Sequence, residues 1–341
     1  MLKNLGAVWE PGAYHGRGTD RVYFEGWYVK LVNQDLSERW AVIPGVFNHP
    51  DPERAHAFIQ ILNGSTSRVE YHRFPQSVFS ASRSKFEVQI GPNHFSEKGC
   101  ELDLENESQT IKGSVQFGDL RPWPVRLLSP GVMGPFGLLP FMQTYHGVLS
   151  LDHFLRGSLS INHKPVSFDE GRGYLEKDWG STFPRAYIWI QTNHFSRSGV
   201  SLTASVATIP WLGNWFRGFL LGLLVDGKLY RFATYLGSKI TRISLSDQEI
   251  DWELEGTARS DLDSRYPKYR LELKAERGSG GMLSSPELDG MTPRILESLT
   301  ASVEVRLTGC NRQGQPEEII YQGKGDCAGL EVAGSVSEIT D

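Results

Sequence analysis

The chain has 341 residues, enough for about two domains or for one large β domain. Hydrophobic residues make up 39% and charged residues 22%, with 36 glycines, which is the composition of an ordinary globular protein and excludes a disordered, collagenous or coiled-coil chain. The formal net charge of −5 comes without any block of like charges, so the sequence lacks the basic footprint of a nucleic-acid-binding protein and we expect no nucleic-acid partner.

The N-terminus and the cysteines indicate the compartment. The segment MLKNLGAVWEPGAYHG has no apolar core and no cleavage pattern, so we expect no signal peptide. Cys100, Cys310 and Cys327 are odd in number and form no C-x-x-C spacing, which argues against a disulfide framework and a zinc knuckle. We therefore expect a cytoplasmic protein in a reducing compartment, and its oligomeric state stays open.

Alternation of apolar and polar residues at period two predicts strands through most of the chain. Clear examples, in chain order, are residues 55–62, 85–90, 186–195, 200–208 and 299–307. Turn signals separate such runs at Asn63-Gly64, Lys98-Gly99, Asp226-Gly227, 312–314 and 323–325. These patterns predict an all-β protein made of antiparallel barrels or sandwiches.

Other segments predict something different from strands. Short helices are expected at 246–249 and at 292–297, where Thr292 would cap the helix and Pro293 would take its first position. The Gly-, Ser- and Pro-rich stretch 277–290 predicts a long connecting loop, with a mobile lid as one interpretation. A domain boundary is expected near 162–173, where the sequence interrupts two strand-rich halves.

Two apolar stretches resemble membrane segments at first sight. Residues 127–151 contain no Asp, Glu, Lys or Arg, but three prolines and three glycines between 130 and 140 would break a helix, so we expect an apolar loop. Residues 218–225 (GFLLGLLV) run into Asp226-Gly227, a hairpin signal. This second stretch predicts a buried strand.

Familiar catalytic signatures are absent from the sequence. It has no glycine-rich nucleotide loop, no H-E-x-x-H and no G-x-S-x-G, which disfavours nucleotide-binding, zinc-protease and serine-hydrolase functions. Two dense groups of aromatic and ionisable residues remain, FEGWY at 24–28 and YLEKDWG at 174–180. These groups are the candidates for chemistry.

Each of the two groups contains a carboxylate two residues away from an aromatic or acidic residue, and this spacing puts both side chains on the same face of a strand. Glu25 lies two residues before Trp27, and Glu176 lies two before Asp178, with Lys177 opposite. In an apolar cavity, desolvation and mutual repulsion raise the pKa of one carboxyl and keep it protonated as an acid. The alternative is a structural ion-pair cluster with Lys177 or Arg185 that stabilises one end of a barrel.

Residues 186–195 form an unusual strand. One face of it would carry Tyr187, Trp189, Gln191, Asn193 and Phe195, a row of rings and amides typical of a binding-pocket wall. The alternative is that the rings fill a barrel core, and Trp27 likewise has the alternative of closing a barrel end.

His146, which follows Tyr145 at the end of the apolar loop, is a candidate base at a cavity mouth, with a hydrogen-bonded structural histidine as the alternative. The nine histidines do not pair with carboxylates at metal-ligand spacing, so we expect no metal.

The segments FEGWYVK (24–30) and EKDWGSTFPRAYIWIQTNHF (176–195) resemble the tocopherol cyclase family, and similar strings occur in related carotenoid hydratases and lipocalin-like pericyclases. The resemblance runs from W-x-P-x-x-Y-H-G at 9–16 to AGLEV at 328–332. It implies two tandem lipocalin-like (calycin-type) antiparallel β-barrels with few short helices. These would span 1–170 and 171–341, and the second would carry the EKDWG motif.

The resemblance also implies an activity without a cofactor, the isomerase reaction of vitamin E biosynthesis. A prenylated hydroquinone adds its phenol oxygen across the nearest alkene of its isoprenoid tail and gives a chromanol, which requires an acid, tolerance of a cation, and a base. The implied catalytic residues are Glu176, Asp178, Glu25 and His146. The implied substrate-binding residues are Trp27, Tyr28, Tyr145, Trp179, Tyr187, Trp189, Gln191 and Asn193.

Within these sets, the resemblance gives each type of residue a task. Asp178 or Glu176 would donate the proton, Glu25 or His146 would accept the phenol proton, aromatic rings would stabilise the cation, and the two amides would bind the head group. Plant members carry Asn where this chain has Asp178, which favours Glu176 as the acid.

Other functions fit the same cavity. In a hydratase, water would capture the cation, and a lipocalin-like carrier of quinones or other lipids would need the cavity but not the acid. The expected partner in every case is a hydrophobic small molecule, and the loop at 127–151 would admit its tail or touch a membrane surface.

Overall fold

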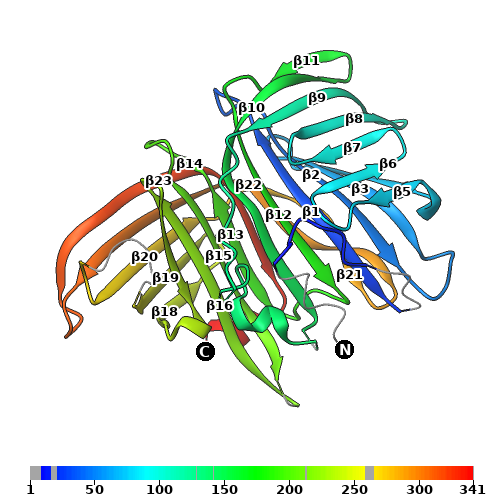
Figure 1. Cartoon of the computed structure of the whole chain (residues 1–341). Helices are drawn as coiled ribbons and strands as arrows, with labels where there is room; N and C mark the ends of the chain where they lie inside the picture. The colour runs from blue at the N-terminus through cyan, green and yellow to red at the C-terminus, as the bar shows by residue number, and fades with distance from the viewer. Residues whose placement is uncertain are drawn as a thin grey trace. The chain divides into compact units, whose positions relative to one another are not determined.

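The computed structural model describes residues 9–16, 21–127, 129–140, 142–211, 213–257 and 265–340. Nearly all of its regular structure is antiparallel β-strand in two sheets of lipocalin-like type, which confirms the predicted all-β class (Figure 1). The chain divides into two compact units. Unit 1 comprises Met1–Phe183 and Gly281–Arg294, and unit 2 comprises Pro184–Gly280 and Ile295–Asp341.

Unit 1 is built on a twelve-stranded sheet. Its strands are β1 (Tyr23–Val32), β2 (Arg39–Asn48), β3 (His56–Asn63), β4 (Arg68–Phe74), β5 (Phe79–Ala81), β6 (Glu87–Ile90), β7 (Asn93–Ser96), β8 (Gly99–Glu105), β9 (Thr110–Gly118), β10 (Thr144–Ile161), β11 (Lys164–Ser167) and β12 (Arg172–Gly180). The hydrogen-bonded order is β4-β3-β2-β1-β12-β10-β9-β8-β7-β6-β5, with β11 on β10.

This sheet curls on itself without closing a ring of hydrogen bonds. Among the described residues, β4 and β5 end the strand path, although β3 contacts β6 across the curl. The expected barrel is therefore an open, curled sheet. One face of it holds an apolar core to which β1 contributes Trp27, Val29 and Leu31 and β12 contributes Leu175.

Unit 2 is built on an eleven-stranded sheet with the order β17-β16-β15-β13-β23-β22-β20-β19-β18. The strands of this sheet are β13 (Tyr187–Thr192), β14 (His194–Phe195), β15 (Ser201–Trp211), β16 (Asn214–Val225), β17 (Lys228–Ala233), β18 (Lys239–Leu245), β19 (Glu249–Gly256), β20 (Lys268–Glu276), β21 (Gly280–Glu287), β22 (Gly290–Cys310) and β23 (Pro316–Ala333), and residues 281–294, in β21 and at the start of β22, belong to unit 1. β14 pairs with β23 and β21 with β22, and a short helix, α1 (Ser337–Thr340), follows. The core of this unit includes Ile188, Val206, Trp252 and Leu271.

Turn chemistry predicted from the sequence is confirmed where a positive φ is needed. Asp226 and Gly227 have φ of +50° and +74° and join β16 to β17 in the two-residue turn that matches the twist of a hairpin. The buried strand predicted at 218–225 is also confirmed as the second half of β16, which is buried from Leu221 to Val225.

Both predicted helices and the predicted long loop are wrong. Residues 246–249 form the turn between β18 and β19, where the Ser246 N–H donates to the Glu249 carbonyl at 2.8 Å. Residues 292–297 lie inside β22, and residues 280–287 form strand β21. The turn predicted at 323–325 is also wrong, because these residues lie inside β23. Pairing between β21 and β22 satisfies the backbone of both segments, and this tertiary pairing outweighs the local Gly and Pro signals.

The units differ from the expected halves in two places. Residues 171–183 belong to unit 1, because β12 pairs with β1 on one edge and β10 on the other, so the EKDWG motif lies in unit 1 and not in the C-terminal half. The β21 hairpin also belongs to unit 1, where Gln60 and Ser284 exchange two hydrogen bonds of 2.7 and 3.2 Å.

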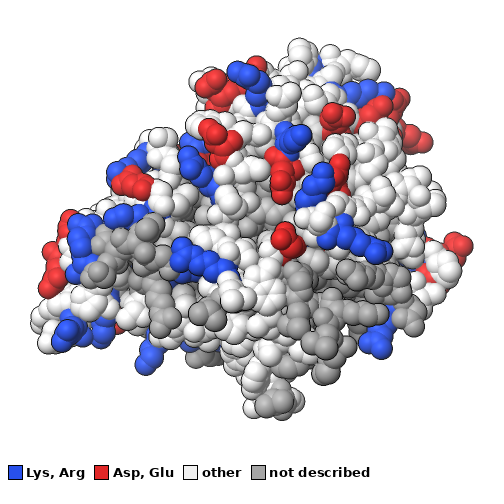
Figure 2. Space-filling view, in the orientation of Figure 1, with Lys and Arg blue, Asp and Glu red and all other residues white. Residues whose placement is uncertain are grey.

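The described residues contain no helix with the length and apolar character needed to cross a membrane. Residues 129–140 of the apolar segment form a loop with a 3-10 turn at Gly134–Leu138, and β10 begins at Thr144. On the face shown in Figure 2, acidic and basic side chains are interspersed, in keeping with the mixed charge of the sequence.

Gly180, the last residue of the EKDWG motif, needs to be glycine for two reasons. Its φ is +153°, and a Cβ there would overlap the Gln143 carbonyl oxygen. We expect Gly180→Ala to lower the free energy of unfolding by about 2 kcal/mol, measured by urea denaturation. Gly118→Ala is the matched control, because a Cβ at that exposed strand position meets no atom within 4 Å. Equal stability of the two variants would contradict this reading of Gly180.

Candidate active site

Three adjacent strands of unit 1 hold the predicted catalytic residues. β12 lies between β1 and β10, with Glu25 opposite Trp179, Tyr28 opposite Glu176, and His146 opposite Asp178. Because successive side chains of a strand point to opposite faces, this register forms two separate clusters, one on each face of the sheet.

The first cluster, here the His146 cluster, consists of His146, Glu176, Asp178 and Tyr174. His146 Nδ1 lies 2.9 Å from Asp178 Oδ1, and His146 Nε2 lies 3.7 Å from Glu176 Oε2. The Tyr174 hydroxyl donates to Glu176 Oε2 at 2.6 Å. The imidazole thus lies between two carboxylates, and the cluster occupies the face of the sheet opposite the apolar core.

Burial and charge act in opposite directions on the His146 imidazole. Burial disfavours its charged form, but the carboxylates of Asp178 and Glu176 and the hydrogen bond to Asp178 outweigh burial and raise the pKa of His146 to about 9. At neutral pH the imidazole is therefore protonated. The Nδ1–H group then donates a hydrogen bond to Asp178 Oδ1, which fixes the orientation of the ring.

The other ring nitrogen of His146 is available for chemistry. Nε2 is buried and has no hydrogen-bond partner among the described residues, although it faces Glu176 Oε2 at 3.7 Å. A protonated Nε2 at this position has a donor proton that it can pass to Glu176 or to a bound ligand. Glu176 is only 4% exposed, so such a transfer would take place largely shielded from water.

The second cluster, here the Lys177 cluster, lies on the core face and anchors the N-terminal segment. Lys177 and Glu25 form an ion pair and are both 0% exposed. Lys177 also donates to the Ala13 carbonyl, while the Glu25 carboxylate accepts from the backbone N–H of His15 at 3.0 Å and of Gly16 at 2.9 Å. The pair therefore ties residues 13–16 to β1 and β12.

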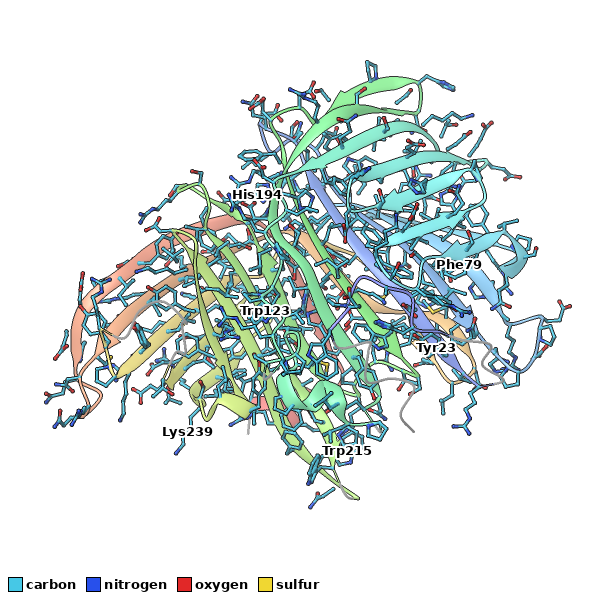
Figure 3. All side chains as sticks on the ribbon, viewed as in Figure 1. Tyr23, Phe79, Trp123, His194, Trp215 and Lys239 are labelled. Carbon is cyan, nitrogen blue, oxygen red and sulfur yellow. The ribbon has the colours of Figure 1, made fainter. Side chains whose placement is uncertain are left out.

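Further groups complete the Lys177 cluster. The Tyr23 hydroxyl donates to Glu25 from the start of β1, where Figure 3 labels it. Burial lowers the pKa of Lys177 to about 8, with Glu25 opposing the shift, so the ammonium stays charged at neutral pH. That ammonium lies 4.9 Å from the Trp27 ring centre and 4.8 Å from the Trp179 ring centre. Both indoles therefore face a resident cation.

A small pocket opens beside His146 in unit 1. Its cavity volume is about 10 Å³, room for about one water molecule and far too little for a substrate ring. Its lining residues are Pro11, Pro130, Gly131, Met133, Gly137, Tyr145, His146 and Trp179. The predicted apolar loop and the Tyr145-His146 pair thus meet at one place, as their sequence proximity suggested.

The structure brings together some predicted site residues and separates others. Glu176, Asp178 and His146 form one cluster, with Tyr28 on the same face. Glu25, Trp27, Tyr145 and Trp179 lie on the opposite face, where Tyr145 stacks on Trp179 with ring centres 5.7 Å apart.

The remaining four predicted residues, Tyr187, Trp189, Gln191 and Asn193, belong to unit 2. Tyr187, Trp189 and Gln191 are buried on the face of β13 opposite Ile188 and Ile190, which join the unit 2 core, and Asn193 is buried just after the end of β13. The Tyr187 hydroxyl donates to Glu331 Oε2 at 2.7 Å. Their role as a substrate-binding wall stays a prediction.

Sequence reasoning missed two features of the clusters. Tyr174 was not singled out, although its position two residues before Glu176 places both on one strand face. His146, Glu176 and Asp178 also offer three possible metal-ligand atoms within 4.8 Å of one another. Spacing along the chain could not reveal this set, because His146 comes from a different strand.

Comparisons with known proteins identify relatives of the chain. The family model described as tocopherol cyclase-like matches residues 132–334. The "Probable tocopherol cyclase, chloroplastic" of Oryza sativa subsp. japonica is 23% identical over 374 residues, covering 94% of this chain and 77% of the rice protein. The "Tocopherol cyclase, chloroplastic" of Zea mays is 26% identical over 374 residues with the same coverage.

Among solved structures, the fold is similar to the crystal structure of CghA with Sch210972. The TM-score is 0.55 at 12% sequence identity, covering 92% of this chain and 89% of that chain. At this identity the likeness concerns the fold alone.

Removing one partner of the Glu25–Lys177 pair leaves a buried charge without its counter-ion. We expect Lys177→Met and Glu25→Gln each to lower the free energy of unfolding by about 3–5 kcal/mol, with the double variant costing much less than their sum. Urea denaturation checks this. Lys324→Met, which breaks an exposed ion pair with Glu276, is the control and should cost little. Additive single effects would show that the two side chains act independently.

Proposed function

This chain belongs to the tocopherol cyclase-like family, and we propose that it is an isomerase that closes a chromanol-type ring on a prenylated hydroquinone. The arrangement that carries this proposal is the His146 cluster, an imidazolium held by Asp178 with its free nitrogen directed at the buried Glu176. A carrier has no need for such a group, whereas protonation of an alkene requires an acid shielded from water.

One proton shared within the cluster is sufficient for the whole cycle. At rest the proton is on His146. When an apolar substrate displaces water, transfer from Nε2 to Glu176 converts an ion pair into two neutral groups, which a low dielectric favours. Glu176 then protonates the alkene, the phenol oxygen bonds to the tertiary carbon, and neutral His146 accepts the phenol proton. Substrate and product have the same atoms, and the enzyme returns to its starting state.

This assignment divides the work among the predicted catalytic residues. Glu176 is the acid, His146 takes the phenol proton and reloads the acid, and Asp178 orients the imidazole and raises its pKa. Glu25 has no part in this cycle, because its carboxylate is occupied by Lys177, Tyr23 and two backbone N–H groups.

The first experiment is turnover by the purified protein of a set of prenylated benzoquinols in the presence of a metal chelator, followed by mass spectrometry. We expect a product of unchanged mass, lost by at least about a hundredfold in Glu176→Gln because the acid is gone. Asp251→Asn, a change to a surface carboxyl on β19, is the matched control and should keep full activity. Asp178→Asn should lower the rate by less than Glu176→Gln does.

The other outcomes of this experiment each point elsewhere. A product heavier by one water would identify a hydratase that uses the same cation. Binding without a product in any sample would leave a carrier. Loss of turnover with the chelator, restored by a divalent metal, would make His146, Glu176 and Asp178 a metal centre and overturn the proton cycle.

The pH dependence follows from the raised pKa of His146. Above about pH 9 the cluster loses its only mobile proton, so we expect kcat to fall as the pH rises through 9. In Asp178→Asn the falling limb should move to lower pH, because one of the carboxylates that stabilise the imidazolium is gone. The same shift contributes stability below pH 6.5, the ordinary value, that is lost as the pH rises through 9. A profile unchanged by Asp178→Asn would contradict this account.

A further inference from the structure

The β15–β16 hairpin of unit 2 extends beyond the sheet that carries it. β13 pairs with β15 as far as Ala207, and β17 pairs with β16 from Leu220 onward. Among the described residues, the rungs beyond those points join only β15 and β16, ending at Trp211 opposite Asn214. Figure 1 shows this pair of strands extending past its neighbours, and Figure 3 labels Trp215 near the tip.

The projecting part of the hairpin is apolar where a solvated ribbon would be polar. From Val200 to Val225 the sequence contains a single charged residue, Arg217, and no acid. Trp211 and Trp215 are 37% and 38% exposed, and exposure rises toward the tip along both strands. Large apolar side chains that stay more than a third exposed at the tip of an apolar ribbon indicate a binding surface.

The two indoles lie on opposite faces of the ribbon. Trp211 shares one face with Phe216, with ring centres 6.1 Å apart, while Trp215 faces the other side beneath the Arg185 guanidinium, 4.2 Å from its ring centre. A protein partner that docks on one face would leave the second indole in water. A lipid bilayer surrounds a tip that enters it, so it can take up both indoles.

The base of the ribbon carries the charged groups that are expected beside a tip inserted into a lipid bilayer. Arg217 donates to the Ile339 carbonyl at 2.6 Å, and Arg185 pairs with Glu338 at 2.7 Å, so the described residues place two guanidinium groups and one carboxylate at the base. Indoles at the level of the head groups with arginines beside them are the usual composition of a membrane-interface anchor. The excess of positive charge favours anionic lipids.

We propose that the tip of the β15–β16 hairpin inserts into the interfacial layer of a lipid bilayer and holds the protein at the membrane surface. This proposal is independent of the reaction proposed above, because it rests on unit 2 and concerns binding to lipid without turnover. It also differs from the membrane contact expected at residues 127–151, which belong to unit 1.

The test is co-sedimentation of the full-length protein with sucrose-loaded vesicles of phosphatidylcholine, alone and mixed with phosphatidylglycerol. We expect the wild type to bind, more strongly with phosphatidylglycerol, and Trp211→Ser/Trp215→Ser to bind at least about tenfold more weakly. The control is Leu288→Ser/Ile319→Ser, which removes two apolar side chains elsewhere that are more exposed than the tryptophans, and this variant should bind as the wild type does. Thermal melting of each variant verifies that it is folded.

A second measurement locates the tip directly. Spin-labelled lipids should quench part of the wild-type tryptophan fluorescence and much less of it in the double variant. The proposal is overturned if the wild type does not sediment with either vesicle, or if the Trp211→Ser/Trp215→Ser protein binds as tightly as the wild type. A wild-type dimer that the double variant abolishes, without binding to vesicles, would show a protein interface in place of a lipid one.

Discussion

The buried pair of Lys177 and Glu25 is the interaction on which the arrangement of unit 1 depends. Two charges without exposure need their mutual attraction and further hydrogen bonds, and this pair obtains them from the N-terminal segment and from Tyr23. The pair thereby fixes β12 against β1 in one register. Because side chains alternate along a strand, fixing Lys177 toward the core also directs Glu176 and Asp178 to the opposite face. The acid site thus depends on an ion pair that takes no part in its chemistry.

The sequence predicted relations within a strand better than relations between strands. Period-two alternation correctly put Glu176 with Asp178, and Glu25 with Trp27, on shared faces. It could not predict that Glu25 and Glu176 point to opposite faces, because that depends on the register between β1 and β12, which are about 150 residues apart in the chain. The same lack of long-range information produced the false helix at 292–297, where pairing with β21 makes a strand of a segment with a helix-like start.

The His146 cluster shows how the pairing of two strands brings a sequence motif together with a residue that is distant in the chain. Glu176 and Asp178 belong to a recognisable motif, but His146 enters the cluster only because β10 pairs with β12 in a register that sets it opposite Asp178. In the sequence, His146 was a candidate base because it lies at the end of an apolar loop. The structure supplies a reason for its protonation, since two carboxylates outweigh burial.

The composition of unit 1 has a consequence for biosynthesis. β1 is translated early but cannot complete its pairing until β12 has left the ribosome, and the β21 hairpin that belongs to the same unit follows about a hundred residues later. Unit 1 therefore depends on one long-range strand pairing, and until β12 is made β1 can pair only with β2 on its other edge. Neither half of the gene expressed alone would encode the whole of unit 1, because residues 281–294 belong to it.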